Sequence, residues 1–201
     1  MSKGLVIVFS APSGGGKGTI LDELKKQNEN LKVSISATTR APRDKDVNGV
    51  NYHFVTKEKF MEMLENGEIL EHAEFCGNYY GTPKGPVMEL TEKGYDVVLE
   101  IEVQGGAQIK KLMPDCVSIF ITPPSLEVLE KRLRNRATEK EEDILKRLAT
   151  AKGELKEAHN YDYVVVNDKL EDAVEDVKAI IKAEKLRYLR NKENFDPSLG
   201  I

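Results

Sequence analysis

The chain has 201 residues, with 30 lysines and arginines, 34 aspartates and glutamates, and a net charge of −4. This length suits one domain, and a hydrophobic share of 40% can build a core, so a wholly disordered chain is excluded. No apolar run approaches the roughly 20 residues of a membrane helix, there is no signal-peptide pattern, and the acidic balance argues against a general nucleic-acid binder. We therefore expect a cytoplasmic protein that binds neither membranes nor nucleic acid.

Strand-like and helix-like patterns alternate along the chain. Residues 4–9 form a continuous apolar run that predicts a buried strand, and Ile20, Leu21 and Leu24 follow a glycine loop at helical spacing. Further strands are predicted over residues 31–36, 95–102, 117–122 and 163–166. Further helices are predicted near residues 60–66, 86–94, 138–155 and 174–181. Strands separated by helices predict a parallel sheet covered on both faces, which is an α/β fold of three layers.

Residues 37–83 do not fit this alternation. They are rich in asparagine, glycine, tyrosine and threonine, and their apolar residues have no regular period. Because the parallel-sheet pattern resumes after them, we expect this stretch to form a smaller lobe inserted into the main domain.

The sharpest motif joins the first predicted strand to the first predicted helix. It consists of Ala11, Pro12, Ser13, Gly14, Gly15, Gly16, Lys17, Gly18 and Thr19. Glycines let successive backbone N–H groups turn towards a phosphate chain, and a lysine at this position reaches the β and γ phosphates. A plain glycine-rich turn is the alternative. The strand and helix on either side favour a loop that binds ATP, with Lys17 as a catalytic cation.

This loop departs twice from the strict phosphate-loop pattern. Ala11 replaces the first glycine, and Gly18 replaces the serine or threonine that normally ligates Mg²⁺. Either the hydroxyl of Thr19 or water can complete a magnesium shell, because Mg²⁺ often keeps several waters.

The sequence resembles guanylate kinases through nearly its whole length. The resemblance is carried by residues 34–43, 49–54, 71–82 and 100–105, which follow the phosphate loop in order. It implies a P-loop NTPase sandwich with a parallel core sheet, an inserted mixed α/β lobe and a helical lid. The implied single domain has its core at about 1–34, 87–125 and 159–201, its GMP-binding lobe at 35–86 and its lid at 126–158. The implied reaction is Mg²⁺-dependent phosphorylation of GMP, and of dGMP, to the diphosphate by ATP.

The same resemblance implies a set of GMP-binding residues. Those that would hold the phosphate are Arg40, Arg43, Tyr52 and Tyr80. Those that would bind guanine are Ser36, Glu71 and Thr82, with Glu102 contacting guanine or a magnesium-bound water. The residue types suit this chemistry, because one carboxylate can accept hydrogen bonds from both N1–H and the 2-amino group of guanine. Two arginines separated by a stiffening proline can converge on one phosphate.

The resemblance also implies a cationic lid over ATP. Arg132, Arg136 and Arg147 match the lid arginines, and Asn167 matches a loop beside the adenine. Asn135 and Ala137 replace glycines that flank the second lid arginine in the family. Phosphoryl transfer leaves charge on the γ-phosphoryl oxygens, so that fixed cations stabilise its transition state.

Two other functions remain open from the sequence. The first is a non-catalytic, guanylate-kinase-like module that binds phosphopeptides, and the second is a kinase for another nucleoside monophosphate. An intact Gly14–Lys17 segment and the lid arginines favour an enzyme, and the set of Ser36, Glu71 and Thr82 favours guanine. The oligomeric state is left open by the sequence.

Overall fold

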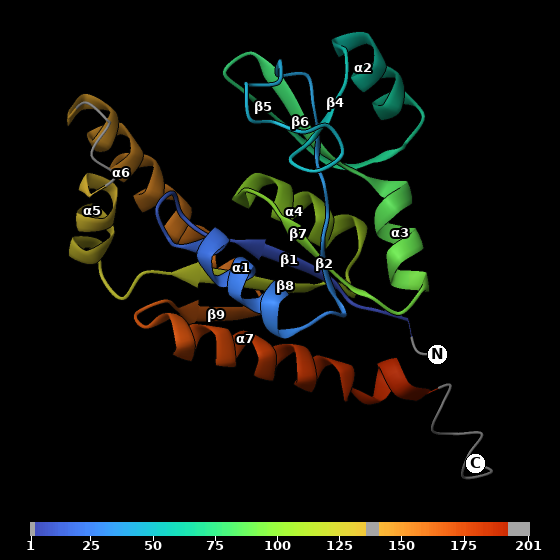
Figure 1. Ribbon diagram of the computed structural model, residues 1–201. Helices are drawn as coiled ribbons and strands as arrows, with labels where there is room; N and C mark the ends of the chain where they lie inside the picture. Colours follow the sequence, from blue (N-terminus) through green and yellow to red (C-terminus); the bar gives the residue numbers. More distant parts are fainter. Residues whose placement is uncertain (1–2, 136–140, 193–201) are drawn as a thin grey trace.

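A five-stranded parallel sheet forms the centre of the molecule (Figure 1). The computed structural model describes residues 3–135 and 141–192. The strands lie in the order β2-β7-β1-β8-β9, and all four pairings are parallel. Their bounds are β1 (Val6–Ser10), β2 (Leu31–Val33), β7 (Asp96–Glu100), β8 (Val117–Thr122) and β9 (Tyr163–Val166).

Helices cover both faces of this sheet because successive side chains of its central strand are buried on opposite faces. Ile7 and Phe9 of β1 pack in one core cluster with α1 (Lys17–Gln27) and α7 (Leu170–Lys185). Val6 and Val8 pack in a second cluster, to which α3 (Lys84–Glu92) and α4 (Val103–Leu112) contribute Val87 and Ile109. The predicted three-layer α/β sandwich is confirmed.

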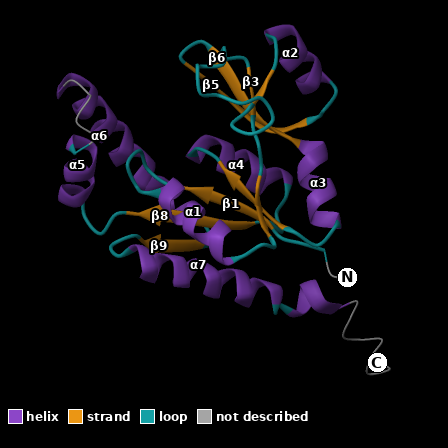
Figure 2. Cartoon of the chain, in the orientation of Figure 1, coloured by secondary structure: helices purple, strands orange, loops and turns teal. Residues whose placement is uncertain are grey.

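Residues 37–83 contain a second sheet, part of a lobe that lies to one side of the parallel sheet (Figure 2). This sheet is mixed and has the strand order β4-β3-β6-β5. Its elements are β3 (Ala37–Thr38), β4 (His53–Phe54), α2 (Lys57–Glu65), β5 (Ile69–Phe75) and β6 (Asn78–Pro83). The β3–β4 pairing is parallel and the other pairings are antiparallel. Phe60 of α2 is fully buried and stacks on Tyr79 with ring centroids 5.7 Å apart, which fixes the helix to this sheet.

Two helices after β8 form a hairpin with its own apolar contact. These are α5 (Leu126–Arg134) and α6 (Glu141–Leu155), and the 3₁₀ helix η1 (Lys156–Asn160) leads from them back to β9. Leu129 and Leu133 of α5 pack against Ile144, Leu148 and Ala151 of α6. Within residues 3–135 and 141–192, no helix has both the length and the apolar character to cross a membrane.

Several predicted element bounds shift in the structure. The strand predicted over 31–36 ends at Val33, since the chain then leaves the parallel sheet and enters the second sheet at Ala37. The strand predicted over 95–102 ends at Glu100, and Glu102 becomes the N-cap of α4. The helix predicted from Pro86 begins at Lys84, because proline is tolerated in a first turn whose N–H groups have no helical partner.

Candidate active site

The predicted ATP-binding residues and Glu102, which was predicted to bind GMP, lie at the carboxyl edge of the parallel sheet. The phosphate loop follows β1, Glu102 follows β7 and Asn167 follows β9. In open parallel α/β sheets, ligands bind outside the carboxyl ends of the strands, where neighbouring chains diverge. The loop is therefore placed at the edge where such folds bind their ligands.

The backbone of the loop depends on two left-handed glycines. Gly14 has φ 87° and Gly16 has φ 89°, a region that glycine adopts without steric strain. The Gly15 N–H donates to the carbonyl of Pro12 at 2.8 Å, and Asn167 Nδ2 donates to the carbonyl of Gly15 at 2.9 Å. The loop ends at the N-terminus of α1, where unpaired N–H groups provide positive potential for an anion.

Lys17, at the end of this loop, lies close to Glu102. Lys17 Nζ donates to the carbonyl of Ile101 at 3.4 Å and lies 3.9 Å from Glu102 Oε1. The Lys17 side chain is 15% exposed, whereas that of Glu102 is 67% exposed. The Lys17 side chain is therefore held by the carbonyl of the residue that follows β7, whereas the Glu102 carboxylate is exposed and accessible to a ligand.

A magnesium ion would find few protein ligands here. The described ranges contain no group of three or more His, Cys, Asp or Glu side chains suited to a metal. Thr19 is exposed in the first turn of α1, and a Cβ at Gly18 would have no atom within 4 Å. This arrangement fits an ion held mainly by nucleotide phosphates and water, with Thr19 or Glu102 as its protein contact.

Two predicted lid arginines contact the loop or its neighbour. Arg132 Nη2 donates to the carbonyl of Asn167 at 2.8 Å, and its Nη1 is buried without a hydrogen-bond partner among the described residues. Arg147 donates to Ser13 Oγ from Nε at 3.0 Å and from Nη2 at 2.9 Å. Arg136 lies outside the described residues. The hairpin of α5 and α6 therefore places one guanidinium group at the phosphate loop and a second at Asn167, whose side chain donates to Gly15 of the loop.

Glu154 of α6 also contacts Ser13, and the sequence did not single it out. Its Oε2 accepts the Ser13 backbone N–H at 3.0 Å. Burial raises the pKa of Glu154; the Ser13 N–H and Lys17 lower it, and the charge of Glu102 raises it. The one available signal was its position seven residues after Arg147, which puts both on one face of α6.

Glu71 and Thr82 form a buried pair in the second sheet. Thr82 Oγ1 donates to Glu71 Oε1 at 2.7 Å. Burial raises the pKa of the Glu71 carboxyl, an effect that the Thr82 hydroxyl partly opposes. A Cβ at Gly105 of α4 would lie 2.5 Å from Glu71 Oε2, so this carboxylate rests against the main domain. Ser36, the third predicted guanine residue, is half-buried just before β3.

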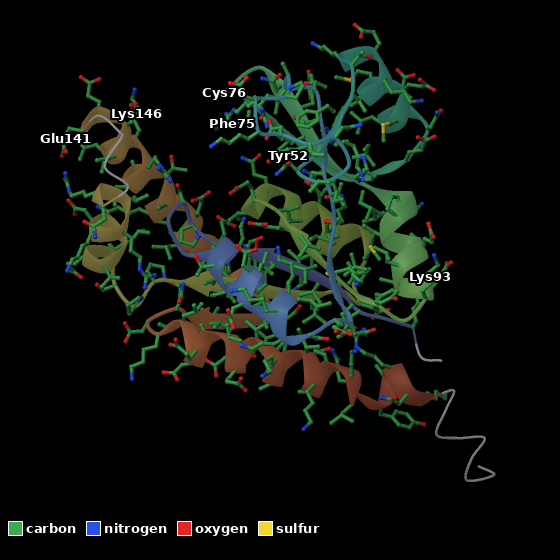
Figure 3. All side chains as sticks on the ribbon, viewed as in Figure 1. Tyr52, Phe75, Cys76, Lys93, Glu141 and Lys146 are labelled. Carbon is green, nitrogen blue, oxygen red and sulfur yellow. The ribbon has the colours of Figure 1, made fainter. Side chains whose placement is uncertain are left out.

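The predicted phosphate residues gather on the same sheet around Arg40. Its Nη2 donates to Asp46 Oδ2 at 2.8 Å, and Asp46 Oδ2 also accepts the Arg43 backbone N–H at 2.8 Å. The Arg40 guanidinium lies 5.4 Å from the centroid of the Tyr52 ring, which contacts the Tyr80 ring edge-on. Figure 3 shows Tyr52 among the side chains of this lobe. The Arg43 side chain is exposed. The sequence did not predict Asp46, which fixes Arg40 before any ligand arrives.

The parallel sheet, the glycine loop and the lysine at the start of α1 define a P-loop nucleotide-binding protein. A family model for guanylate kinase matches residues 3–184. Guanylate kinase from Carboxydothermus hydrogenoformans is 51% identical over 190 residues, which cover 94% of this chain and 93% of that protein. Guanylate kinase from Clostridioides difficile is 50% identical over 192 residues, covering 96% and 94%.

A solved structure agrees with these sequence matches. The crystal structure of guanylate kinase from Anaplasma phagocytophilum superposes with a TM-score of 0.78 at 34% identity. The match covers 100% of this chain and 97% of that one. The chain belongs to the guanylate kinase family.

Proposed function

We propose that this protein transfers the γ-phosphoryl group of ATP to GMP and dGMP, releasing ADP and the corresponding diphosphate. The observation that carries the choice of acceptor is the buried Glu71 carboxylate, oriented by Thr82 and resting against Gly105. Membership of the guanylate kinase family supports the same reaction. No observation favours the non-catalytic phosphopeptide module.

Guanine recognition is assigned to Glu71, Thr82 and Ser36. Oε2 of Glu71 and the remaining lone pair of Oε1 can accept from N1–H and the 2-amino group of the base. Adenine has no such pair of donors on one edge. The Ser36 hydroxyl can donate to O6, which completes a set that distinguishes guanine from the other bases.

Phosphate recognition is assigned to Arg40, Arg43, Tyr52 and Tyr80. The Asp46 contact holds Arg40 in one orientation, and the two tyrosine hydroxyls add neutral donors beside it. A guanidinium already oriented by a carboxylate loses less rotamer freedom when it binds a phosphate oxygen. The GMP phosphate is thereby directed towards the phosphate loop.

Phosphoryl transfer itself requires positioning and charge compensation. An oxygen of the GMP phosphate attacks the γ-phosphorus in line; its bond to phosphorus forms as the bond to the β,γ-bridging oxygen breaks. Lys17 and the loop N–H groups bind the phosphate chain, and Arg132, Arg136 and Arg147 compensate charge that develops in the transition state. Closure of the lobe (35–86) and the lid (126–158) excludes water, which would otherwise hydrolyse ATP.

We assign Mg²⁺ as the metal cofactor, held with ATP and contacted by Thr19 or by Glu102 through water. When bound, this ion neutralises phosphate charge and orients the β and γ phosphates. Because ATP and GMP are cytoplasmic metabolites, we also assign the protein to the cytoplasm, within purine nucleotide metabolism.

A coupled assay of ADP release tests the function. Purified protein with ATP and Mg²⁺ is supplied with GMP, dGMP, AMP, CMP or UMP, and a reaction without acceptor serves as the control. We expect rapid ADP release with GMP and dGMP alone, and its loss when EDTA removes Mg²⁺. Release with AMP or a pyrimidine monophosphate at equal efficiency would refute the guanine assignment, and none with any acceptor would refute the kinase assignment.

A further inference from the structure

Two side chains of α6 converge on one residue of the phosphate loop. Glu154 accepts the Ser13 backbone N–H at 3.0 Å, and Arg147 donates twice to the Ser13 hydroxyl, at 3.0 and 2.9 Å. Seven residues make about two turns of helix, so both side chains extend from one face of α6. Figure 1 shows the C-terminal end of α6 beside the loop between β1 and α1. Helix α6 and the phosphate loop are therefore joined at Ser13.

The negative charge of Glu154 does not itself favour ATP. A carboxylate beside a triphosphate repels it, and Glu102 already supplies one carboxylate near Lys17. Among the described residues, Lys17 and Tyr161 also interact electrostatically with Glu154, and Arg147 donates to the same residue, Ser13. Attraction of the nucleotide therefore cannot account for an acid at this position. The hydrogen bond from the Ser13 N–H to Glu154 can explain the acid, because it fixes the geometry of the loop.

We propose that Glu154 is a positioning residue for phosphoryl transfer, whose hydrogen bond to Ser13 N–H anchors α6 to the phosphate loop and thereby holds Arg147 over the phosphate chain. This inference rests on the proposed function, because it uses Arg147 as a phosphate-binding group. It concerns the acceptor oxygen of Glu154 and not its charge. A side chain of similar size without an acceptor should therefore fail, and an uncharged acceptor should suffice.

The test compares two variants of the full-length enzyme. Glu154→Leu keeps much of the volume but cannot accept the Ser13 N–H, and we expect kcat to fall between about tenfold and a hundredfold, the size of loss that misplaced catalytic groups produce. Glu154→Gln retains an acceptor oxygen, so kcat should stay within about threefold of wild type, with no increase in the KM for ATP. The matched control is Glu142→Leu, an exposed acid on the same helix.

A double variant tests whether Glu154 acts through Arg147. If it does, Glu154→Leu should lower kcat little further, by less than about threefold, when Arg147→Ala is already present. Hydrogen exchange of backbone amides can be measured on the wild-type protein, so it does not depend on the folding of a variant. We expect the Ser13 N–H to be protected from exchange although it lies in a loop. Circular dichroism and urea unfolding establish that each variant compared is folded.

The possible outcomes distinguish a failure of the Glu154 inference from a failure of the proposed function. The inference would be overturned by a Glu154→Leu enzyme with wild-type kcat, by equal losses in the Leu and Gln variants, by multiplicative losses in the double variant, or by rapid exchange of the Ser13 amide. A wild-type enzyme that releases no ADP in the presence of GMP would instead refute the proposed function.

Discussion

The hydroxyl of Thr82 donates a 2.7 Å hydrogen bond to Oε1 of Glu71, and both side chains are buried, with exposures of 0% and 6%. The two residues lie on the adjacent antiparallel strands β5 and β6, where the register shifts between Ile69 and His72. A buried carboxylate with one oxygen already bonded has few orientations open to it. It can meet a ligand without first losing rotamer freedom.

The first prediction concerns the selectivity of this carboxylate for guanine. Glu71→Gln keeps the shape but can turn a donor NH₂ towards the donors of the base. We expect the loss of transition-state binding free energy for GMP to be roughly 2–4 kcal/mol. This loss lowers kcat/KM for GMP by about thirtyfold to nearly a thousandfold. IMP lacks the 2-amino group and should lose less. The measurement is kcat/KM for both nucleotides, with the exposed Glu74→Gln on the same strand as the control. Equal losses for GMP and IMP would mean that Glu71 does not bind the 2-amino group.

The second prediction concerns pH. Burial raises the pKa of Glu71, so the folded, unliganded protein protonates this carboxyl at a higher pH than an exposed glutamate would require. Protonation removes an acceptor for guanine. The KM for GMP should therefore rise as the pH falls through this raised pKa, while the KM for ATP changes less. Glu71→Gln cannot titrate, and its KM for GMP should lack this dependence; persistence of the full dependence in that variant would contradict the assignment.

The third prediction uses the contact between the two halves of the site. A Cβ added at Gly105 would lie 2.5 Å from Glu71 Oε2 and 3.1 Å from its Cδ, so Gly105→Ala must displace the carboxylate. We expect kcat/KM for GMP to fall at least about tenfold, with little change in the KM for ATP. Gly85→Ala in α3, where a Cβ meets nothing within 4 Å, is the control. A raised KM for ATP in Gly105→Ala would show instead that the phosphate loop had moved.

Local patterns explain why the main domain could be predicted from the sequence. The strands at 117–122 and 163–166 have the predicted bounds, because each is a short β-branched run between polar residues. Local patterns predicted the second sheet only as an irregular lobe, and its mixed α/β character was implied by the family resemblance. Its strands β3 and β4 have two residues each, too few to reveal an alternation of period two.

Residues that act through tertiary contacts could not be found in this way. Gly105 matters because it has no side chain and so leaves room for the Glu71 carboxylate. Asp46 matters because it accepts a hydrogen bond from Arg40. Glu154 meets a backbone N–H 141 residues away. The Gly105 and Asp46 contacts leave no local period or spacing in the sequence, and Glu154 leaves only its seven-residue spacing from Arg147. Arg136, which the family resemblance did assign, lies outside the described residues.

The fourth prediction concerns the departure from the strict motif at Gly18. A Cβ there meets nothing within 4 Å, and Gly18 lies in the first turn of α1, so Gly18→Ser should fit and stabilise the helix by about 0.5 kcal/mol. Its hydroxyl should also lower the Mg²⁺ concentration needed for half-maximal activity. Gly153→Ala within α6 has equal space and should stabilise without changing the Mg²⁺ requirement. A Gly18→Ser enzyme that needs more Mg²⁺ would contradict this view of the loop.

The last prediction separates the two groups of arginines. Arg40 lies beside Tyr52 on the second sheet and should grip the GMP phosphate in the ground state and the transition state alike. Arg147 lies at Ser13 and should meet charge that develops during transfer. Loss of a charge-assisted hydrogen bond changes binding by about tenfold to a hundredfold, so Arg40→Ala should raise the KM for GMP by this factor.

For Arg147→Ala we expect the same factor to appear in kcat, because the removed interaction strengthens only in the transition state. Arg134→Ala provides the control: this exposed arginine of α5 pairs with Glu130 and Glu141 and should leave both constants within about threefold of wild type. Steady-state kinetics with GMP and ATP varied in turn give kcat and the two KM values for each enzyme. The opposite result would be a lower kcat in Arg40→Ala and a higher KM for GMP in Arg147→Ala. It would reverse the two assignments, because binding energy shared by the ground state and the transition state cannot alter kcat.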